Sequence, residues 1–145
     1  MPTIATQRLQ NQQIEYPRMK NPVEALSWLG AIQGQDYSGA KWSLGLRVPG
    51  STDAQIEALI AEKQIVRAWL MRGTLFLVAG ADLRWMLELI APRTIANGMR
   101  RKRELGLDDE TLSRSYGILV KTLEGGNSLT RRQLLAILEE NGISN

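Results

Sequence analysis

Two β-rich runs separated by a glycine-containing turn constrain the fold of this chain more than any other feature. Residues 65–71 (IVRAWLM) and 75–78 (LFLV) are rich in β-branched, aromatic and other apolar side chains. Arg72, Gly73 and Thr74 stand between the two runs. This pattern predicts a β-hairpin. Helical periodicity dominates the rest of the chain, so the hairpin is expected to belong to a mainly helical fold.

Several helical segments are predicted before the hairpin. A short helix is expected around Arg8, Leu9 and Gln12, and Pro22 can begin a second helix because its missing N–H has no partner in a first turn. The apolar stripe of that second helix repeats every three residues at Val23, Leu26, Leu29 and Ile32. Residues 42–48 alternate in polarity and predict an extended segment that Pro49-Gly50 ends. Thr52 and Gln55 form a capping-box pattern for a further helix, with its buried face at Ile56, Leu59 and Ile60.

The second half of the chain is predicted to be helical throughout. One face carries Leu83, Met86, Leu87 and Ile90, and Pro92 is expected to break or restart that helix. Asp108 and Asp109 begin another helix, which Gly125-Gly126 ends. Its buried side is expected at Leu112, Tyr116, Leu119, Val120 and Leu123. Thr130 and Gln133 form a second capping box, and the helix they open carries Leu134, Leu135 and Leu138.

Helix, helix and then hairpin is the element order of a winged helix, a variant of the helix-turn-helix DNA reader. We therefore expect residues 1–80 to form a first winged-helix unit with an N-terminal segment. Residues 81–126 would be connecting helices, and residues 127–145 the start of a second helix-turn-helix unit. The chain is thus expected to be the N-terminal part of a tandem winged-helix protein, although a natural domain can also end on a docked helix.

Composition excludes several kinds of chemistry. The chain contains neither cysteine nor histidine, so it has no disulfide, no thiolate or imidazole metal ligand and no Ser-His-Asp machinery. No loop is spaced like an oxygen-ligated metal site, and neither a metal nor a cofactor is expected. No apolar run reaches a membrane-spanning length, so no membrane partner is expected, and the N-terminus lacks a signal-peptide pattern. The absence of cysteine fits a cytoplasmic setting best. The formal charge of +3 is compatible with a polyanionic partner.

Several strings resemble one known family. They are RLQNQQI at 8–14, LGAIQGQDYSGAKWSLGLR at 29–47, IVRAWLMRGTLFLV at 65–78, DLRWMLELIAPR at 82–93 and LTRRQLLAILEENGI at 129–143. Together they resemble the tandem winged-helix DNA glycosylases that unhook interstrand crosslinks and confer azinomycin resistance. The resemblance covers nearly the whole chain, and its most specific parts are QGQDY and MRGTL.

This resemblance implies a catalytic motif and an activity. The motif, a glutamine followed after one residue by glutamine or aspartate, falls on Gln33 and Gln35. The implied reaction is hydrolysis of the N-glycosidic bond of alkylated purines, especially N7-alkylguanine, in duplex DNA that is alkylated or crosslinked. From spacing alone, the two glutamines would be read as solvated or capping side chains. The family commonly reads RGTLH where this chain has RGTLF, so Phe76 replaces a histidine.

Basic residues provide candidate DNA contacts. Arg67, Arg72 and Thr74 flank the hairpin turn and could reach phosphates as a wing does, whereas Arg67 could instead pair with Glu62. Further candidates lie in the helical half of the chain: Arg93, Arg100, Arg101, Lys102, Arg131 and Arg132. The four tryptophans are expected to pack in the core or to be half-buried: Trp28, Trp42, Trp69 and Trp85.

Three functions fit these features. The first is a DNA-repair glycosylase, active in the complete protein and inactive as this chain alone. The second is a non-catalytic winged-helix DNA-binding protein or transcriptional regulator. The third is a winged-helix module that binds protein. A winged helix serves all three roles, so the fold alone does not decide among them.

Overall fold

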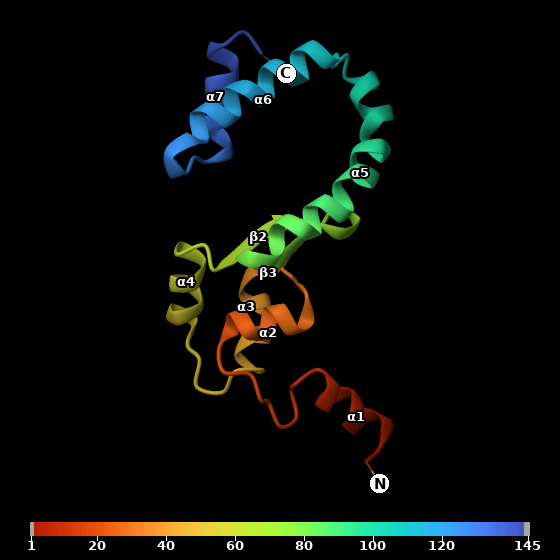
Figure 1. Cartoon of the computed structure of the whole chain (residues 1–145), viewed down its shortest axis with the longest axis vertical. Helices are drawn as coiled ribbons and strands as arrows, with labels where there is room; N and C mark the ends of the chain where they lie inside the picture. The colour runs from red at the N-terminus through yellow and green to blue at the C-terminus, as the bar shows by residue number, and fades with distance from the viewer. Residues whose placement is uncertain (1, 144–145) are drawn as a thin grey trace. The chain divides into compact units, whose positions relative to one another are not determined.

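The computed structural model describes residues 2–143, and the chain divides into two compact units, Met1–Thr94 and Ile95–Asn145. The first unit contains most of the secondary structure (Figure 1). In chain order it comprises α1 (Ile4–Asn11), α2 (Pro22–Leu29), β1 (Ile32–Gln33), α3 (Tyr37–Gly45), α4 (Asp53–Ala61), β2 (Ile65–Trp69), the 3₁₀ turn η1 (Met71–Gly73), β3 (Leu75–Ala79) and the beginning of α5 (Gly80–Glu104). The second unit holds the end of α5, then α6 (Asp109–Leu123), the 3₁₀ turn η2 (Glu124–Gly126) and α7 (Arg131–Glu140). The described fold is therefore mainly helical with one small sheet.

The sheet has three antiparallel strands in the order β1-β3-β2. The predicted hairpin is confirmed, with Arg67 opposite Leu77 and Trp69 opposite Leu75. Strand β1 was not predicted, since Ile32 was assigned to the apolar stripe of the second helix; that assignment is wrong, because α2 ends at Leu29 and Ile32 pairs with Leu77 of β3. Strand β1 also pairs Gln33 with Phe76, and this pairing joins the candidate catalytic segment directly to the hairpin.

Two apolar clusters cover the two faces of the sheet. On one face, helices α2, α3 and α4 supply buried side chains such as Leu26, Leu44 and Ile56, which pack with Leu77 of β3. On the other face, Phe76 and Val78 pack against Met86 near the start of α5. Alternation along β3 sends successive side chains to opposite faces, so this one strand belongs to both clusters.

The predicted helix starts are confirmed by their caps. Asn21 caps α2, and Asp108 caps α6. Both capping boxes form, with Thr52 and Gln55 at α4 and Thr130 and Gln133 at α7. Each box satisfies two backbone N–H groups that would otherwise lack a partner at the first turn of its helix.

The extended segment predicted for residues 42–48 is wrong, because helix α3 covers residues 37–45. Asp36 caps this helix by accepting a hydrogen bond from the Gly39 N–H at 3.0 Å. The buried positions Ala40 and Leu44 are four residues apart, which is the spacing of one helix face. The alternation that suggested a strand begins at Trp42, in the middle of the helix, and hides this longer period.

The break predicted at Pro92 is also wrong, since α5 continues through it to Glu104. The proline ring removes one hydrogen bond, to the carbonyl of Glu88, while the turns on both sides keep theirs. Pro92 is exposed, so the Glu88 carbonyl, which receives no hydrogen bond from Pro92, lies close to solvent.

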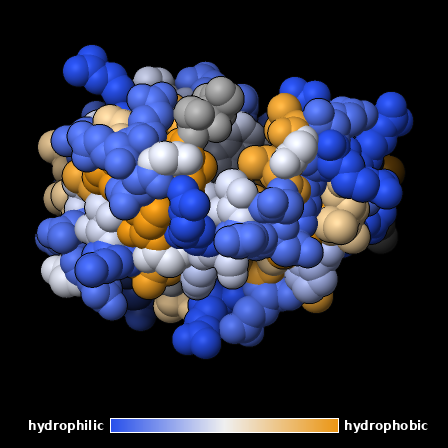
Figure 2. Space-filling view, turned by 90° about the horizontal axis from the view of Figure 1, so that it is seen from above, coloured by the Kyte–Doolittle hydropathy of each residue, from blue (hydrophilic) through white to orange (hydrophobic). Residues whose placement is uncertain are grey.

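Exposure differs from the sequence-based expectation at two sets of apolar residues. All four tryptophans are exposed, by between 51% and 68%. Helix α6 has no buried residue, although its apolar side was predicted to be buried, and no residue from 95 to 143 is buried. Exposed apolar side chains appear as orange patches among blue polar ones in Figure 2. Within residues 2–143, no helix has both the length and the apolar character needed to cross a membrane.

Candidate active site

The segment Gln33-Gly34-Gln35, called the glutamine segment below, lies directly against strand β3. The pocket that its two glutamines line is called the glutamine pocket. The Gly34 N–H donates to the Leu75 carbonyl at 2.7 Å. A Cβ atom on Gly34 would lie only 3.2 Å from the Leu77 nitrogen and 3.3 Å from the Phe76 carbonyl carbon. Backbone atoms cannot move aside cheaply, so the lack of a side chain at position 34 allows this close approach.

Arg67 holds the same segment from strand β2. Its Nε donates to the Gly34 carbonyl at 2.9 Å, and its Nη2 donates to the Gln35 carbonyl at 3.3 Å. The guanidinium carbon also lies 5.3 Å from the centre of the Tyr37 ring, within the range of a cation–π contact. The predicted alternative, an ion pair with Glu62, does not form within residues 2–143. Whether Arg67 contacts DNA stays a prediction, but its fork is already engaged with the backbone of the motif.

The two glutamine side chains differ in how they are held. Gln35 Oε1 accepts a hydrogen bond from the Leu75 N–H at 3.2 Å. Because a backbone N–H can only donate, this contact requires the amide oxygen. The Gln35 NH₂ group is left available to donate to another partner. The Gln33 side chain is exposed and makes no hydrogen bond with another residue of the described chain. Both glutamines line a surface pocket of about 360 Å³, together with Ile32, Asp36, Gly39, Ala40 and Ser43.

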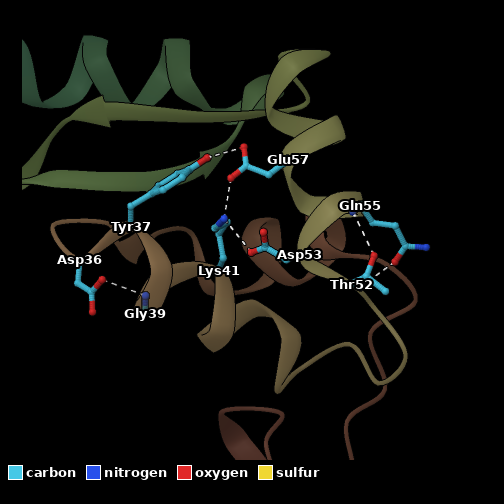
Figure 3. Close-up of polar contacts among 8 residues, drawn as sticks. All are labelled: Asp36, Tyr37, Gly39, Lys41, Thr52, Asp53, Gln55 and Glu57. Atoms are coloured by element: carbon cyan, nitrogen blue, oxygen red, sulfur yellow. Dashed lines mark hydrogen bonds and ion pairs between the residues drawn. The ribbon is translucent and has the colours of Figure 1, made fainter.

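A polar network fixes α3, which forms one wall of this pocket, to α4. Lys41 Nζ lies 2.7 Å from Asp53 Oδ1 and 2.6 Å from Glu57 Oε1, and the Tyr37 hydroxyl donates to Glu57 at 2.9 Å (Figure 3). The hydrogen bonds from Lys41 and then Tyr37 hold the pKa of Glu57 below its usual value. Hydrogen bonds to Asp53 and Glu57 raise the pKa of Lys41. Desolvation, followed by the contact with Glu57, raises the pKa of Tyr37.

Phe76, which replaces the histidine common in the resembling family, is buried in the cluster beneath α5. It is the register partner of Gln33. Partners across an antiparallel pair project from the same face of a sheet, so position 76 lies beside Gln33. A phenyl ring there supplies packing and no proton-transfer group.

Two of the three predicted hairpin contacts, Arg72 and Thr74, lie at the end of the hairpin, whereas Arg67 lies in the middle of β2. Arg72 is exposed and adopts a left-handed conformation with φ of 57°, and it forms no ion pair with any residue from 2 to 143. The neighbouring Gly73 also has a positive φ. The Thr74 hydroxyl donates to the Met71 carbonyl at 3.1 Å, so it stabilises the turn.

The other predicted DNA contacts differ in whether their charge is already paired. Arg100 and Arg101 both bond to Glu104, at 2.9 and 3.3 Å, and Lys102 pairs with Asp109. The two pairs with Glu104 are exposed and are worth only about 0.2–1 kcal/mol each, so a phosphate could replace this carboxylate. The Lys102 side chain is mostly covered. In the described part of the chain, ion pairs are absent from the exposed residues Arg93, Arg131 and Arg132.

Sequence reasoning did not find the network of Tyr37, Lys41, Asp53 and Glu57. One signal was available, since Asp53 and Glu57 are four residues apart and share a helix face that could receive a cation. The carbonyl contacts of Arg67 had no comparable signal, because its partners are more than thirty residues away.

Comparison with known proteins identifies the class of protein. A family model described as DNA glycosylase AlkZ-like matches residues 26–144, a span that includes the glutamine segment, the hairpin and the later helices. The chain therefore belongs to the AlkZ-like DNA glycosylase family, and the resemblance seen in the sequence is confirmed. DNA is accordingly its indicated substrate class, and DNA repair its general role. No curated protein and no solved structure matched the chain.

Proposed function

We propose that this protein hydrolyses the N-glycosidic bond of N7-alkylated purines in duplex DNA, including bases joined in interstrand crosslinks. The observation that supports the proposal best is the pocket that Gln33 and Gln35 line, where the Leu75 N–H orients the Gln35 amide. Membership of a DNA glycosylase family supports a reaction at this bond.

The chemistry requires no histidine. Alkylation at N7 gives the purine a positive charge, so its N9 can accept the electron pair of the breaking C1′–N9 bond and leave as a neutral base. A water oxygen forms the new bond to C1′, and its released proton passes to solvent. The protein then has to stabilise the positive charge that develops on the sugar and hold the attacking water on the opposite face. Side-chain amides can position water, although they are weak bases.

The two glutamines would divide this task. The Gln35 amide oxygen is occupied by the Leu75 N–H, so its NH₂ group can donate to a sugar, phosphate or water oxygen. The Gln33 amide oxygen has no partner in the described chain and can accept a hydrogen bond from the attacking water. A donor and an acceptor at neighbouring positions would orient one water molecule better than either alone.

We further propose that residues 1–80 act as a winged-helix unit within a tandem arrangement. The order α2-β1-α3-α4-β2-β3, with strands arranged β1-β3-β2, supports this assignment. Helix α4 exposes the carboxylates Asp53 and Glu57, which disfavour insertion into an anionic groove. DNA would instead contact the end of the hairpin at Arg72. Further cations would come from the connecting helices, residues 81–126, and from the start of a second unit, residues 127–145.

The test is alkali-revealed abasic-site formation on duplex DNA that carries N7-methylguanine, using the full-length protein. Base release should fall at least tenfold in Gln33→Ala and in Gln35→Ala. Gln64→Ala is the matched control, because Gln64 is also an exposed glutamine of the first unit, and among residues 2–143 its side-chain amide hydrogen-bonds only to Glu62. Wild-type protein that releases no base from this duplex or from a crosslinked one would refute the proposal.

The second candidate is a DNA-binding protein without glycosylase activity. Phe76 favours it, because a buried phenyl ring occupies the place of the family's common histidine. This candidate requires salt-dependent duplex binding without base release. The same assay therefore separates the two functions.

A further inference from the structure

The indole of Trp69 is an exposed aromatic surface on β2, across strand β3 from the glutamine segment, and it does not itself line the glutamine pocket. Trp69 is the last residue of β2 and is 62% exposed. Its register partner is Leu75, the residue whose N–H orients the Gln35 amide. Leu75 of β3 is therefore a neighbour of both Trp69 and Gln35.

The face of the sheet from which Trp69 projects supports this placement. Side chains two residues apart on a strand share a face, so Trp69 projects with Arg67. Arg67 reaches the Gly34 and Gln35 carbonyls from that face. The indole consequently projects from the face on which Arg67 holds the Gly34 and Gln35 carbonyls, whereas Gln33 projects from the opposite face together with Phe76.

We propose that Trp69 is the stacking surface for the alkylated purine, an inference that rests on the proposed glycosylase function. An exposed indole offers a flat π face that matches a purine, and aromatic side chains commonly bind bases in this way. Tryptophan also gives the strongest cation–π attraction of the aromatic residues. A purine alkylated at N7 is cationic, so the indole would favour the lesion over a neutral base.

The other tryptophans lack this combination. Trp85 donates its indole N–H to Asp82 at 3.0 Å. Trp28 lies on α2 and Trp42 lies on α3, so neither is on the strand that pairs with Leu75. Trp28 is 60% exposed, which makes it a matched control for the loss of a surface indole.

Two measurements on the full-length protein test the proposal. The first is single-turnover base release from duplex DNA with N7-methylguanine, for Trp69→Ala, Trp69→Phe and Trp28→Ala. The loss of one stacked base corresponds to roughly a 5- to 150-fold decrease, which we expect for Trp69→Ala. Trp69→Phe should recover most of the rate, and Trp28→Ala should match wild type. A Trp69→Ala protein that is folded by circular dichroism and releases base at the wild-type rate would overturn the proposal.

The second measurement does not depend on catalysis. A variant in which every other tryptophan is replaced by phenylalanine, Trp28, Trp42 and Trp85 among them, reports the fluorescence of Trp69 alone. A duplex with 2′-fluoro-N7-methylguanosine, whose glycosidic bond resists hydrolysis, should quench this emission more than the same duplex with unmodified guanine. Equal quenching by the two duplexes would contradict stacking of the lesion on Trp69. If wild-type protein releases no base but the quenching difference is present, the proposed function fails while the stacking site stands.

Discussion

Arg67 Nε lies 2.9 Å from the carbonyl oxygen of Gly34, in the middle of the glutamine segment. A long side chain of β2 thereby holds a backbone that belongs to the connection between β1 and α3. Its position is further defined by the Tyr37 ring, which the Lys41 network ties to α4. The glutamine segment is thus held by β2, β3 and α3 together.

The first prediction concerns Arg67→Lys. A lysine ammonium lacks the planar fork that reaches two carbonyls, so Gln35 should lose its fixed position. We expect base release to fall by roughly 10- to 100-fold, since small misplacements of reacting groups are costly. The dependence of duplex affinity on salt should stay unchanged, because lysine keeps the positive charge.

Arg67→Gln separates a positioning role from a phosphate contact. If Arg67 serves only the glutamine segment, the slope of log affinity against log salt should match wild type. A slope smaller by about one would instead show that Arg67 binds a phosphate. That result would contradict our assignment of Arg67 as a positioning residue.

The second prediction concerns Gly34→Ala. The added methyl group would press on the Leu77 nitrogen and the Phe76 carbonyl carbon, so β1 must move away from β3. We expect a loss of about 1–3 kcal/mol in the free energy of unfolding, measured by urea denaturation, together with reduced base release. Gly98→Ala is the control, because a Cβ there meets no atom within 4 Å and α5 should gain stability. Equal free energies of unfolding for Gly34→Ala and wild type would show that β1 can move away from β3 without a loss of stability.

The third prediction concerns Arg72→Gly. Glycine accommodates the left-handed conformation at this position, and its added entropy in the unfolded chain offsets the relief of strain. Unfolding free energy should therefore change by less than about 1 kcal/mol. Duplex affinity should fall, and the salt slope should decrease by about one if Arg72 contacts a phosphate. Arg84→Gln removes an exposed charge that pairs with Glu88, and an equal effect there would point to net charge alone.

The fourth prediction concerns pH. Because the pKa of folded Glu57 is below its unfolded value, its stabilising contribution is present above about pH 4.3 and is lost as pH falls through the folded value. The raised pKa of Lys41 places the loss of its contribution at alkaline pH, above about 10.4. Thermal unfolding of wild type and Glu57→Gln should show a gap in Tm at pH 7 that narrows below pH 4. A difference in Tm that stays constant with pH would exclude the ionisation of Glu57 as its source.

Local signals in the sequence determined the parts of the fold whose causes are local. Capping residues such as Thr52 and Thr130 lie within three positions of the groups they satisfy, so both helix starts were predictable. The hairpin was predictable for the same reason, since its strands are joined by one short turn. The family was also readable from the sequence. The resemblance to that family is what marked Gln33 and Gln35 as candidate catalytic residues.

Only the tertiary structure decided the rest. The strand at Gln33 exists because β3 offers it a partner, and Arg67 reaches Gly34 across a separation of 33 residues. Exposure of the tryptophans likewise depends on which elements surround each one, since an indole is compatible with both core and surface positions. Spacing along the chain carries no information about such contacts, because they form only when distant segments pack together.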